Sequence, residues 1–520
     1  MQRRTLLLAP ASAMSSLDAV ALPKPDAYAG AGVAALSAAM ASGRLSAAQL
    51  VERYLVRIEA IDRHGPKLNS IIELNPDARG IARALDAERK AGHVRGPLHG
   101  IPVLLKDNIA TGDAMRTSAG SLALADLRVA RDAHLVRRLR ESGAVILGKT
   151  NLSEWANIRS TRSTSGWSAR GGLTRNPYAL DRNCSGSSAG TGAAIAADLA
   201  SIGVGTETDG SIVSPASICG LVGLKPSVGR ISRDGIIPIS HTQDTAGPMA
   251  RTVADAAALY AAMCGPDGAD RISQSAPEPG TWVPAAGAMR GARLGVARAY
   301  FIGYDEADAI IEQAITTLRA LGAEIIDDVD LPPVAYADAE LSVLLYELKA
   351  GLSRWLAEFA PRSGLRSLRE LIDFNRQHRD EEMPWFGQEL FERADKLGDL
   401  DSPAYVEALA ACAKGSREDS LDRVFDKHRL DAIIAPTGGP AWLTDPVNGD
   451  HVIGGFSTPA AVAGYPHLTV PAGLVHGLPI GLSFVGRLWS EWRLLELGQA
   501  FEAAAQARRP PRYFKRSVPV

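Results

Sequence analysis

Short apolar runs alternate with helical segments along most of this chain, and this alternation limits the fold more than any other feature. Buried strands are predicted at 101–105, 144–147 and within 430–437. The segment 292–332 has the pattern of a strand, a helix and a second strand. Such alternation is typical of proteins in which helices cover the faces of a central sheet. We therefore expect an α/β fold with a large mixed, mostly parallel central sheet flanked by helices.

The first long helix is the best defined of the predicted elements. Ser46 and Gln49 are spaced as a capping box, in which each side chain satisfies a free backbone N–H at the helix start. Apolar residues follow at helical spacing up to Ile61, and Gly65-Pro66 ends the pattern. A second helix is predicted from Arg79 to Lys90.

The length of 520 residues would suggest about three domains, but no convincing linker interrupts the sequence. We expect a flexible N-terminus at 1–28, one domain at 29–510 and a C-terminal tail at 511–520. The sequence MQRRTLLLAPASAM has the charged, apolar and A-x-A parts of an export signal, with a twin arginine. The prediction is an exported or periplasmic protein; the alternative is a cytoplasmic protein with a disordered tail.

Composition narrows the classes of partner. The formal net charge is −2, which gives no electrostatic footprint for nucleic acid, and no run of 18 apolar residues predicts a membrane span. The four cysteines form no CxxC pair and the ten histidines no HExxH, so no metal is expected. No P-loop occurs, and no GxGxxG follows a strand, so no cofactor is expected either. The oligomeric state is not encoded in any pattern that we recognise.

Two segments rich in glycine and hydroxyl residues are candidates for a site. The stretch GTETDGSIVSPASICGLVGLKP at 205–226 is too rich in small residues for a buried strand and too apolar for a linker. It suits a backbone that a ligand approaches closely. The stretch GSSAG at 186–190 matches the GxSxG elbow of α/β-hydrolases, with Ser188 as nucleophile, but no apolar strand precedes it. An esterase of that kind is kept as an alternative.

Lys106 is the third candidate, because a lysine is unusual at the end of the apolar run IPVLLK. If it is buried without a carboxylate partner, desolvation lowers its pKa and makes it available as a general base. The alternative is a strand-end lysine paired with Asp107.

Lys106, the pair Ser187-Ser188 and Ser211 occur in one chain order with several longer motifs. These are GPLHGIPVLLKDN, AVILGKTNLSEWA, GSSAGTGAAIAADLASIGVGTETDGSI, SPASICGLVGLKPSVGRIS and QDTAGPMARTVADAA. Together they resemble the amidase signature family, over roughly residues 30–505. Within that family, TETDGSIV, SRDGIIPIS and NLSEWAN are most similar to bacterial enzymes that remove the C-terminal amide of peptides.

The resemblance implies hydrolysis of a carboxamide through an acyl-enzyme, with release of ammonia or an amine. It implies that Ser211 is the nucleophile, Ser187 a bridging serine after a cis peptide bond, and Lys106 the base. Ser188 would support this network, and Gly186 would remove a Cβ clash at the cis bond.

The same resemblance places an oxyanion hole in the loop that leads to the nucleophile. Its donors would be the backbone N–H groups of Thr208, Asp209, Gly210 and Ser211. The family often has glycine where Asp209 stands, and arginine where Val213 stands. The first difference preserves the backbone donor, and the second favours an uncharged or apolar substrate over one that carries a carboxylate.

Two further alternatives remain at this point. Members of the same family act as the ammonia-delivering subunit of a tRNA-dependent amidotransferase, which would require glutaminase activity and partner chains. A binding module without catalysis would leave Lys106, Ser187 and Ser211 without a shared role.

Overall fold

The structure, a computed structural model, describes residues 27–278, 280, 282 and 287–516. The predicted export signal, at residues 1–14, lies outside this part of the chain, as does most of the predicted flexible N-terminus at 1–28. No helix in the described ranges is long and apolar enough to cross a membrane. Tyr513, in the predicted C-terminal tail, is buried, and its N–H donates to the carbonyl of Pro177 at 3.0 Å. This part of the tail therefore packs against the rest of the domain.

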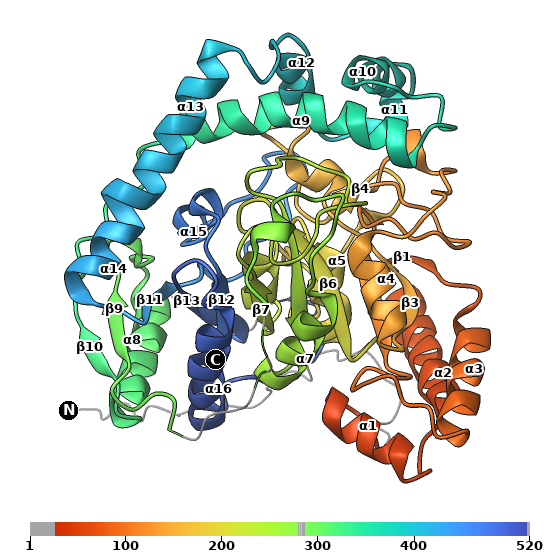
Figure 1. Cartoon of the computed structure of the whole chain (residues 1–520), viewed down its shortest axis with the longest axis horizontal. Coiled ribbons are helices and arrows are strands. Elements are labelled where there is room, and N and C mark those ends of the chain that lie inside the picture. The colour runs from red at the N-terminus through yellow and green to blue at the C-terminus, as the bar shows by residue number, and fades with distance from the viewer. Residues whose placement is uncertain (1–26, 279, 281, 283–286, 517–520) are drawn as a thin grey trace, which may run out of the picture.

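A mixed sheet of eleven strands runs through the described part of the molecule, and helices flank it, as the sequence predicts (Figure 1). The order across the sheet is β1 (Ile71–Leu74), β3 (Val145–Thr150), β2 (Pro102–Lys106), β6 (Ile202–Glu207), β8 (Thr245–Ala250), β7 (Val222–Lys225), β12 (His467–Val475), β13 (Leu478–Val485), β11 (Ala432–Pro436), β9 (Arg293–Val296) and β10 (Glu324–Ile326). A separate small sheet pairs β4 (Trp167–Ser168) with β5 (Gly172–Leu173).

The sheet contains two groups of parallel strands, and antiparallel pairs join the remaining neighbours. Parallel pairing joins β3, β2 and β6, and also β11, β9 and β10. Antiparallel pairs join the other neighbours. The hairpin between β12 and β13 turns at His476 and Gly477, both with positive φ, which is the backbone of a tight two-residue hairpin turn. Strands that follow each other through such short turns must pair antiparallel.

The predicted helices are present close to their expected bounds. The helix after the capping box is α2 (Ala47–Arg57), and both of the box's hydrogen bonds form. It continues as a π-helical segment, Ile58–His64, up to Gly65. The other helices up to α8, with the last two, are α1 (Val33–Ala41), α3 (Ala78–Lys90), α4 (His134–Glu141), α5 (Ala189–Ala196), α6 (Val213–Ile218), α7 (Val253–Met263), α8 (Asp305–Ala320), α15 (Thr458–Ala463) and α16 (Glu491–Ala505).

A second group of helices forms an arch across one end of the molecule. It consists of α9 (Ala337–Phe359), α10 (Leu368–Gln377), α11 (Arg379–Glu382), α12 (Glu389–Asp395), α13 (Pro403–Ala413) and α14 (Asp422–His428). In Figure 1 the long helix α9 spans the top of the view and α13 descends from it on the left. Glu340 on α9 bonds to Gln243, so this group contacts the centre of the fold.

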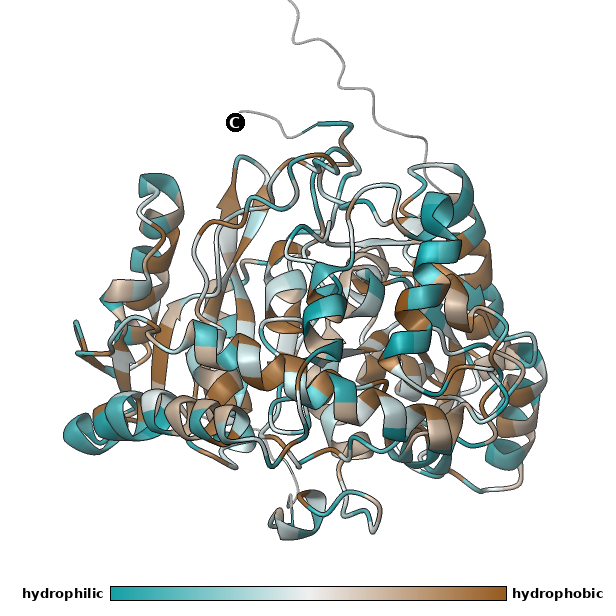
Figure 2. Cartoon of the chain, turned by 90° about the horizontal axis from the view of Figure 1, so that it is seen from above, coloured by the Kyte–Doolittle hydropathy of each residue, from teal (hydrophilic) through white to brown (hydrophobic). Residues whose placement is uncertain are grey.

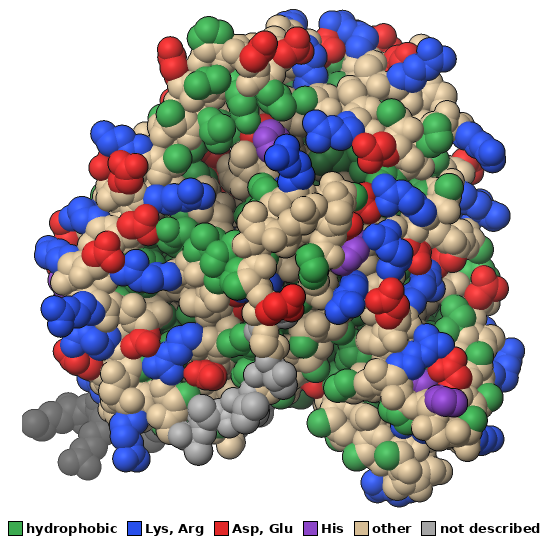
Figure 3. Space-filling view, viewed as in Figure 1, with side chains coloured by type: hydrophobic (Ala, Val, Ile, Leu, Met, Phe, Trp, Pro, Cys, Tyr) green, Lys and Arg blue, Asp and Glu red, His purple; other side chains and the backbone are tan. Residues whose placement is uncertain are grey.

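The core lies around the central strands. All five residues of β2 are buried, as are all six of β3 and all six of β6. The strands at the centre are largely apolar, whereas hydrophilic residues gather on the outer helices (Figure 2). On the face seen in Figure 3, basic and acidic side chains are interspersed. A polar group at the end of a central strand therefore lies in a low-dielectric environment.

Candidate active site

Lys106 is the last residue of β2, between β3 and β6, and its side chain is fully buried. Its Nζ lies 2.7 Å from Ser187 Oγ, 2.8 Å from Thr206 Oγ1 and 3.2 Å from the carbonyl oxygen of Thr206. The carbonyl can only accept, so Nζ must donate to it. A neutral amine has two protons and one lone pair, which leaves it able to accept from one of the two hydroxyls.

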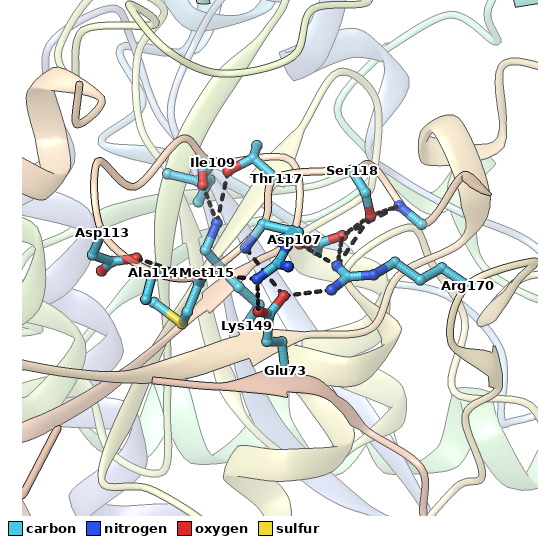
Figure 4. Close-up of polar contacts among 12 residues, drawn as sticks. Glu73, Asp107, Ile109, Asp113, Ala114, Met115, Thr117, Ser118, Lys149 and Arg170 are labelled. Atoms are coloured by element: carbon cyan, nitrogen blue, oxygen red, sulfur yellow. Dashed lines mark hydrogen bonds and ion pairs between the residues drawn. The ribbon is translucent and has the colours of Figure 1, made fainter. Parts of the chain in front are cut away.

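Burial is the main reason that the pKa of Lys106 is low. Desolvation lowers it to about 7, and the negative charges of Asp244 and Glu207 oppose that shift. The alternative pairing with Asp107 does not form. The Asp107 carboxylate instead accepts from Ser118 Oγ and pairs with Arg170 Nη1 at 3.3 Å (Figure 4).

Ser187 and Ser188 stand just before α5, and both are fully buried. The peptide bond between Gly186 and Ser187 is cis, as the family resemblance implies. A Cβ on Gly186 would lie 2.2 Å from Ser153 Oγ, so only glycine fits there. Ser188 Oγ donates to the Thr206 carbonyl at 3.1 Å and accepts from the Thr206 N–H at 3.3 Å. A buried hydroxyl bonded to backbone is unsuited to the esterase alternative, which needs an exposed nucleophile.

Ser211 lies in the loop between β6 and α6, and 8% of its surface is exposed. Its carbonyl accepts from the N–H of Ser188 at 3.2 Å, so the two serine segments are in contact. Glu207 Oε2 accepts from the N–H groups of Ile212 at 2.7 Å and Val213 at 3.0 Å. The two backbone N–H groups that follow Ser211 are therefore already bonded within the protein. The backbone N–H groups before it remain available to a ligand.

The side chains of Thr208 and Asp209 hold the predicted oxyanion loop in place, and the backbone of Gly210 requires glycine. Thr208 Oγ1 donates to Asp244 Oδ1 at 2.6 Å. Thr458 Oγ1, at the start of α15, donates to Asp209 Oδ2 at 2.6 Å. Gly210 has φ +76°, and a Cβ there would lie 3.0 Å from Ser457 Oγ, so both conformation and space favour glycine.

A cavity of about 450 Å³ opens beside these segments. Its wall includes Gly186, next to Ser187, and Gly210, next to Ser211. Val213 is also in the wall, where the family often has arginine. The cavity's acidic side chains are Asp209 and Asp450, and no lysine, arginine or histidine is among the described residues that line it.

Several contacts of this site were not predicted from the sequence. Thr206 receives two of the three contacts of Lys106, and Asn108 Nδ2 donates to Thr206 Oγ1 at 3.0 Å. Thr206 directly precedes the segment ETDGS. Its position at the end of a strand, next to the glycine loop, was the sequence feature that could have indicated its contact with Lys106. Asp450 lies far from the serine motifs in sequence, and no local pattern marks it. Asp244 belongs to the motif QDTAGPMARTVADAA, but that motif alone gave its side chain no role.

A family model described as Amidase matches residues 49–495 of the chain. A probable amidase of Arabidopsis thaliana is 40% identical over 487 residues, covering 90% of this chain and 89% of that protein. The chain therefore belongs to the amidase family, as the resemblance to the amidase signature predicts, and it is an amidase, a hydrolase.

Solved structures narrow the similarity further. The chain is 51% identical to the native peptide amidase from Stenotrophomonas maltophilia, with a TM-score of 0.89 over 94% of this chain and 99% of that one. It is equally identical, at 51% and a TM-score of 0.89, to a peptide amidase in complex with the competitive inhibitor chymostatin, covering 93% and 99% of the two chains. One subunit of the glutamyl-tRNA(Gln) amidotransferase from Chloroflexus aurantiacus is 36% identical over 485 residues, covering 90% of this chain and 96% of that one.

Proposed function

We propose that this amidase cleaves C-terminal peptide amides with Lys106 as base, Ser187 as proton relay and Ser211 as nucleophile. The contact of 2.7 Å between Lys106 Nζ and Ser187 Oγ, inside a fully buried site, is the observation that carries this proposal. Ser211 is the member of the set with exposed surface, as a group that meets substrate must be.

In the first half-reaction, neutral Lys106 accepts the Ser187 proton while Ser187 accepts that of Ser211. Ser211 Oγ forms a bond to the amide carbon, and the carbonyl oxygen becomes an oxyanion that Thr208, Asp209, Gly210 and Ser211 stabilise through backbone N–H groups. One such donor is typically worth about 3–4 kcal/mol of barrier.

The proton then returns along the same relay to the substrate nitrogen. The C–N bond breaks, ammonia leaves, and the acyl group remains as an ester on Ser211. In the second half-reaction, water gives a proton to the relay and attacks the ester carbon, which releases the peptide acid and restores the Ser211 hydroxyl.

The charge of the cavity supports an amide substrate that lacks a nearby carboxylate. Asp209 and Asp450 line it without a basic partner among the described residues of the wall, and Val213 replaces a family arginine. A free amino acid such as glutamine would bring its own carboxylate into this field, which is unfavourable. Similarity to peptide amidases, one of them bound to chymostatin, supports the same substrate class.

The Ser211→Ala variant tests the catalytic assignment. We expect ammonia release from an amidated dipeptide to fall by at least about 10³-fold, because the acyl-enzyme cannot form. A serine-directed phosphonate should add once to the wild-type chain and not to the variant, as intact mass would show. An unchanged melting temperature is the control for folding. Near-normal turnover by the variant would refute the assignment.

Similarity to an amidotransferase favours one second candidate, the delivery of ammonia from glutamine. The purified single chain separates the two. A peptide amidase releases ammonia from the amidated dipeptide and leaves free glutamine unhydrolysed, whereas a preference for glutamine would favour the second candidate.

A further inference from the structure

The helical arch reaches the oxyanion loop through one side chain. Glu340 lies in the first turn of α9 and is buried, with 8% of its surface exposed. Its Oε1 accepts from Gln243 Nε2 at 2.9 Å, and the same Nε2 lies 3.3 Å from the carbonyl oxygen of Thr208. Gln243 therefore connects a helix of the arch to the first residue of the predicted oxyanion hole.

Glu340 also contacts the second residue of that loop directly. Its carboxyl group also lies within hydrogen-bonding reach of the carboxyl group of Asp209. Oδ2 of Asp209 accepts from Thr458, whereas its Oδ1 is buried and has no hydrogen-bond partner among the described residues when both carboxyl groups are ionised. Two carboxyl groups can form a hydrogen bond only when one of them keeps its proton.

We propose that Glu340 is a positioning residue, which holds the backbone of Thr208 and Asp209 in place through Gln243 and through its bond to the Asp209 carboxyl group. The inference rests on the proposed oxyanion hole. The pairing ties α9 and the loop into one rigid unit, so that the N–H groups stay aimed at the place where the oxyanion forms.

Protonation of the pair sets a pH limit on this contact. Burial, with the charge of Asp209, raises the pKa of Glu340 to about 8. Burial also raises the pKa of Asp209, but the hydrogen bond from Thr458 Oγ1 and the charge of Lys225 oppose that shift and favour the Asp209 carboxylate. Glu340 is thus the donor, and above about pH 8 its proton is lost and two negative charges repel each other behind the loop.

Other titratable groups face the pair from the elements around it. Lys225 on β7 attracts Asp209, while Glu207 on β6 repels it. Tyr336, before α9, and Cys412 on α13 lie near Glu340, and burial raises the pKa of both, that of Cys412 to about 12. Both are neutral near pH 8. Burial lowers the pKa of Lys225 to about 8, so among these neighbouring groups it is Lys225 whose titration overlaps that of Glu340.

The Glu340→Gln and Glu340→Ala variants test the proposal. Glutamine can accept from Gln243 through its oxygen and donate to Asp209 through its nitrogen, with no titrating proton. We expect the wild-type kcat for an amidated dipeptide to decline above about pH 8. The Gln variant should keep kcat within about threefold at pH 7 and lose that decline, and the Ala variant should lose about tenfold or more in kcat at every pH.

The outcomes separate this proposal from the proposed function. A Gln variant that keeps the wild-type alkaline decline would overturn the inference and assign the decline to another group, with Lys225 first among them. An Ala variant with normal kcat would overturn it as well. Both results leave the roles of Ser211 and Lys106 untouched, since those depend on the Ser211→Ala result.

Discussion

Two lysines on neighbouring strands make the clearest comparison within this molecule. Lys106 ends β2 and Lys149 lies near the end of β3, and both side chains are fully buried. Burial lowers the pKa of Lys106 to about 7 and that of Lys149 to about 8. Lys149 Nζ donates to the Ile109 carbonyl at 2.6 Å and to Thr117 Oγ1 at 3.1 Å (Figure 4).

The partners of the two amines differ although their burial does not. Lys106 bonds to Ser187, whose neighbour Gly186 lines the cavity. Lys149 bonds to both ends of the loop that follows Lys106, and Asp107 closes the same loop by accepting from the N–H of Ser118 at 3.1 Å.

A charged network surrounds this loop. Figure 4 shows Arg170 between Asp107 and Glu73, with an ion pair to each. We infer that Lys149 fastens the loop and takes no part in proton transfer. Desolvation makes a lysine able to act as a base, but only a relay that leads to the substrate makes use of it.

The largest expected difference is in activity. Lys106→Met should lower kcat/KM for a peptide amide by at least about 10³-fold, because loss of a general base removes the proton acceptor of the relay. Lys149→Met should stay within about tenfold of the wild type. Ammonia release measured side by side checks this, with near-UV circular dichroism as the control for folding. Equal losses in the two folded variants would contradict the distinction.

The second prediction concerns how the free energy of unfolding depends on pH. Both lysines should contribute in the same direction, and Lys106 should contribute more. In the unfolded chain each lysine keeps its proton up to about pH 10.4, whereas in the folded chain Lys106 loses it near pH 7. The unfolded state therefore binds more protons between these values, and stability rises with pH there.

Replacement by methionine removes this pH dependence. Relative to the wild type, Lys106→Met should gain about 2–3 kcal/mol in the free energy of unfolding when the pH is lowered from 9.5 to 7. Lys149→Met should change in the same direction and by less, since the pKa of Lys149 is less depressed. Urea unfolding at the two pH values measures the change. A relative gain that grows as the pH rises would contradict the assigned pKa shifts.

The sequence predicted those parts of the molecule that depend on local patterns. The capping box of α2, the buried strand that ends at Lys106 and the helix after Ser188 are set by residues close to one another in the chain. The serine motifs were identified because their spacing resembles a family. The apolar runs did not determine strand direction, because an apolar run has the same pattern in either orientation.

Contacts between distant segments could not be predicted in this way. Glu340 meets Asp209 only because α9 crosses over the loop, and the two are 131 positions apart. Thr458 reaches Asp209 across a separation of 249 residues. Such pairings follow from the packing of whole elements, and a single buried acid leaves no periodic signal in the sequence.

The smallest expected effect comes from the hydroxyl partners of the two lysines. Thr206 Oγ1 accepts from Lys106 Nζ at 2.8 Å, which favours the charged amine, and Thr117 Oγ1 does the same for Lys149. For the wild type, kcat/KM should rise with pH through a midpoint of about 7 as Lys106 loses its proton. Thr206→Val should move that midpoint to lower pH and reduce the plateau by about tenfold, since one bond that orients the base is lost.

Thr117→Val is the matched control, because it removes the same group from the other lysine. It should leave both the midpoint and the plateau unchanged within about twofold. A midpoint shift in Thr117→Val equal to that in Thr206→Val would mean that the two amines titrate as one system. Lys149 would then have to be included in the proton-transfer site. The distinction between Lys106 as a base and Lys149 as a purely structural residue would be wrong.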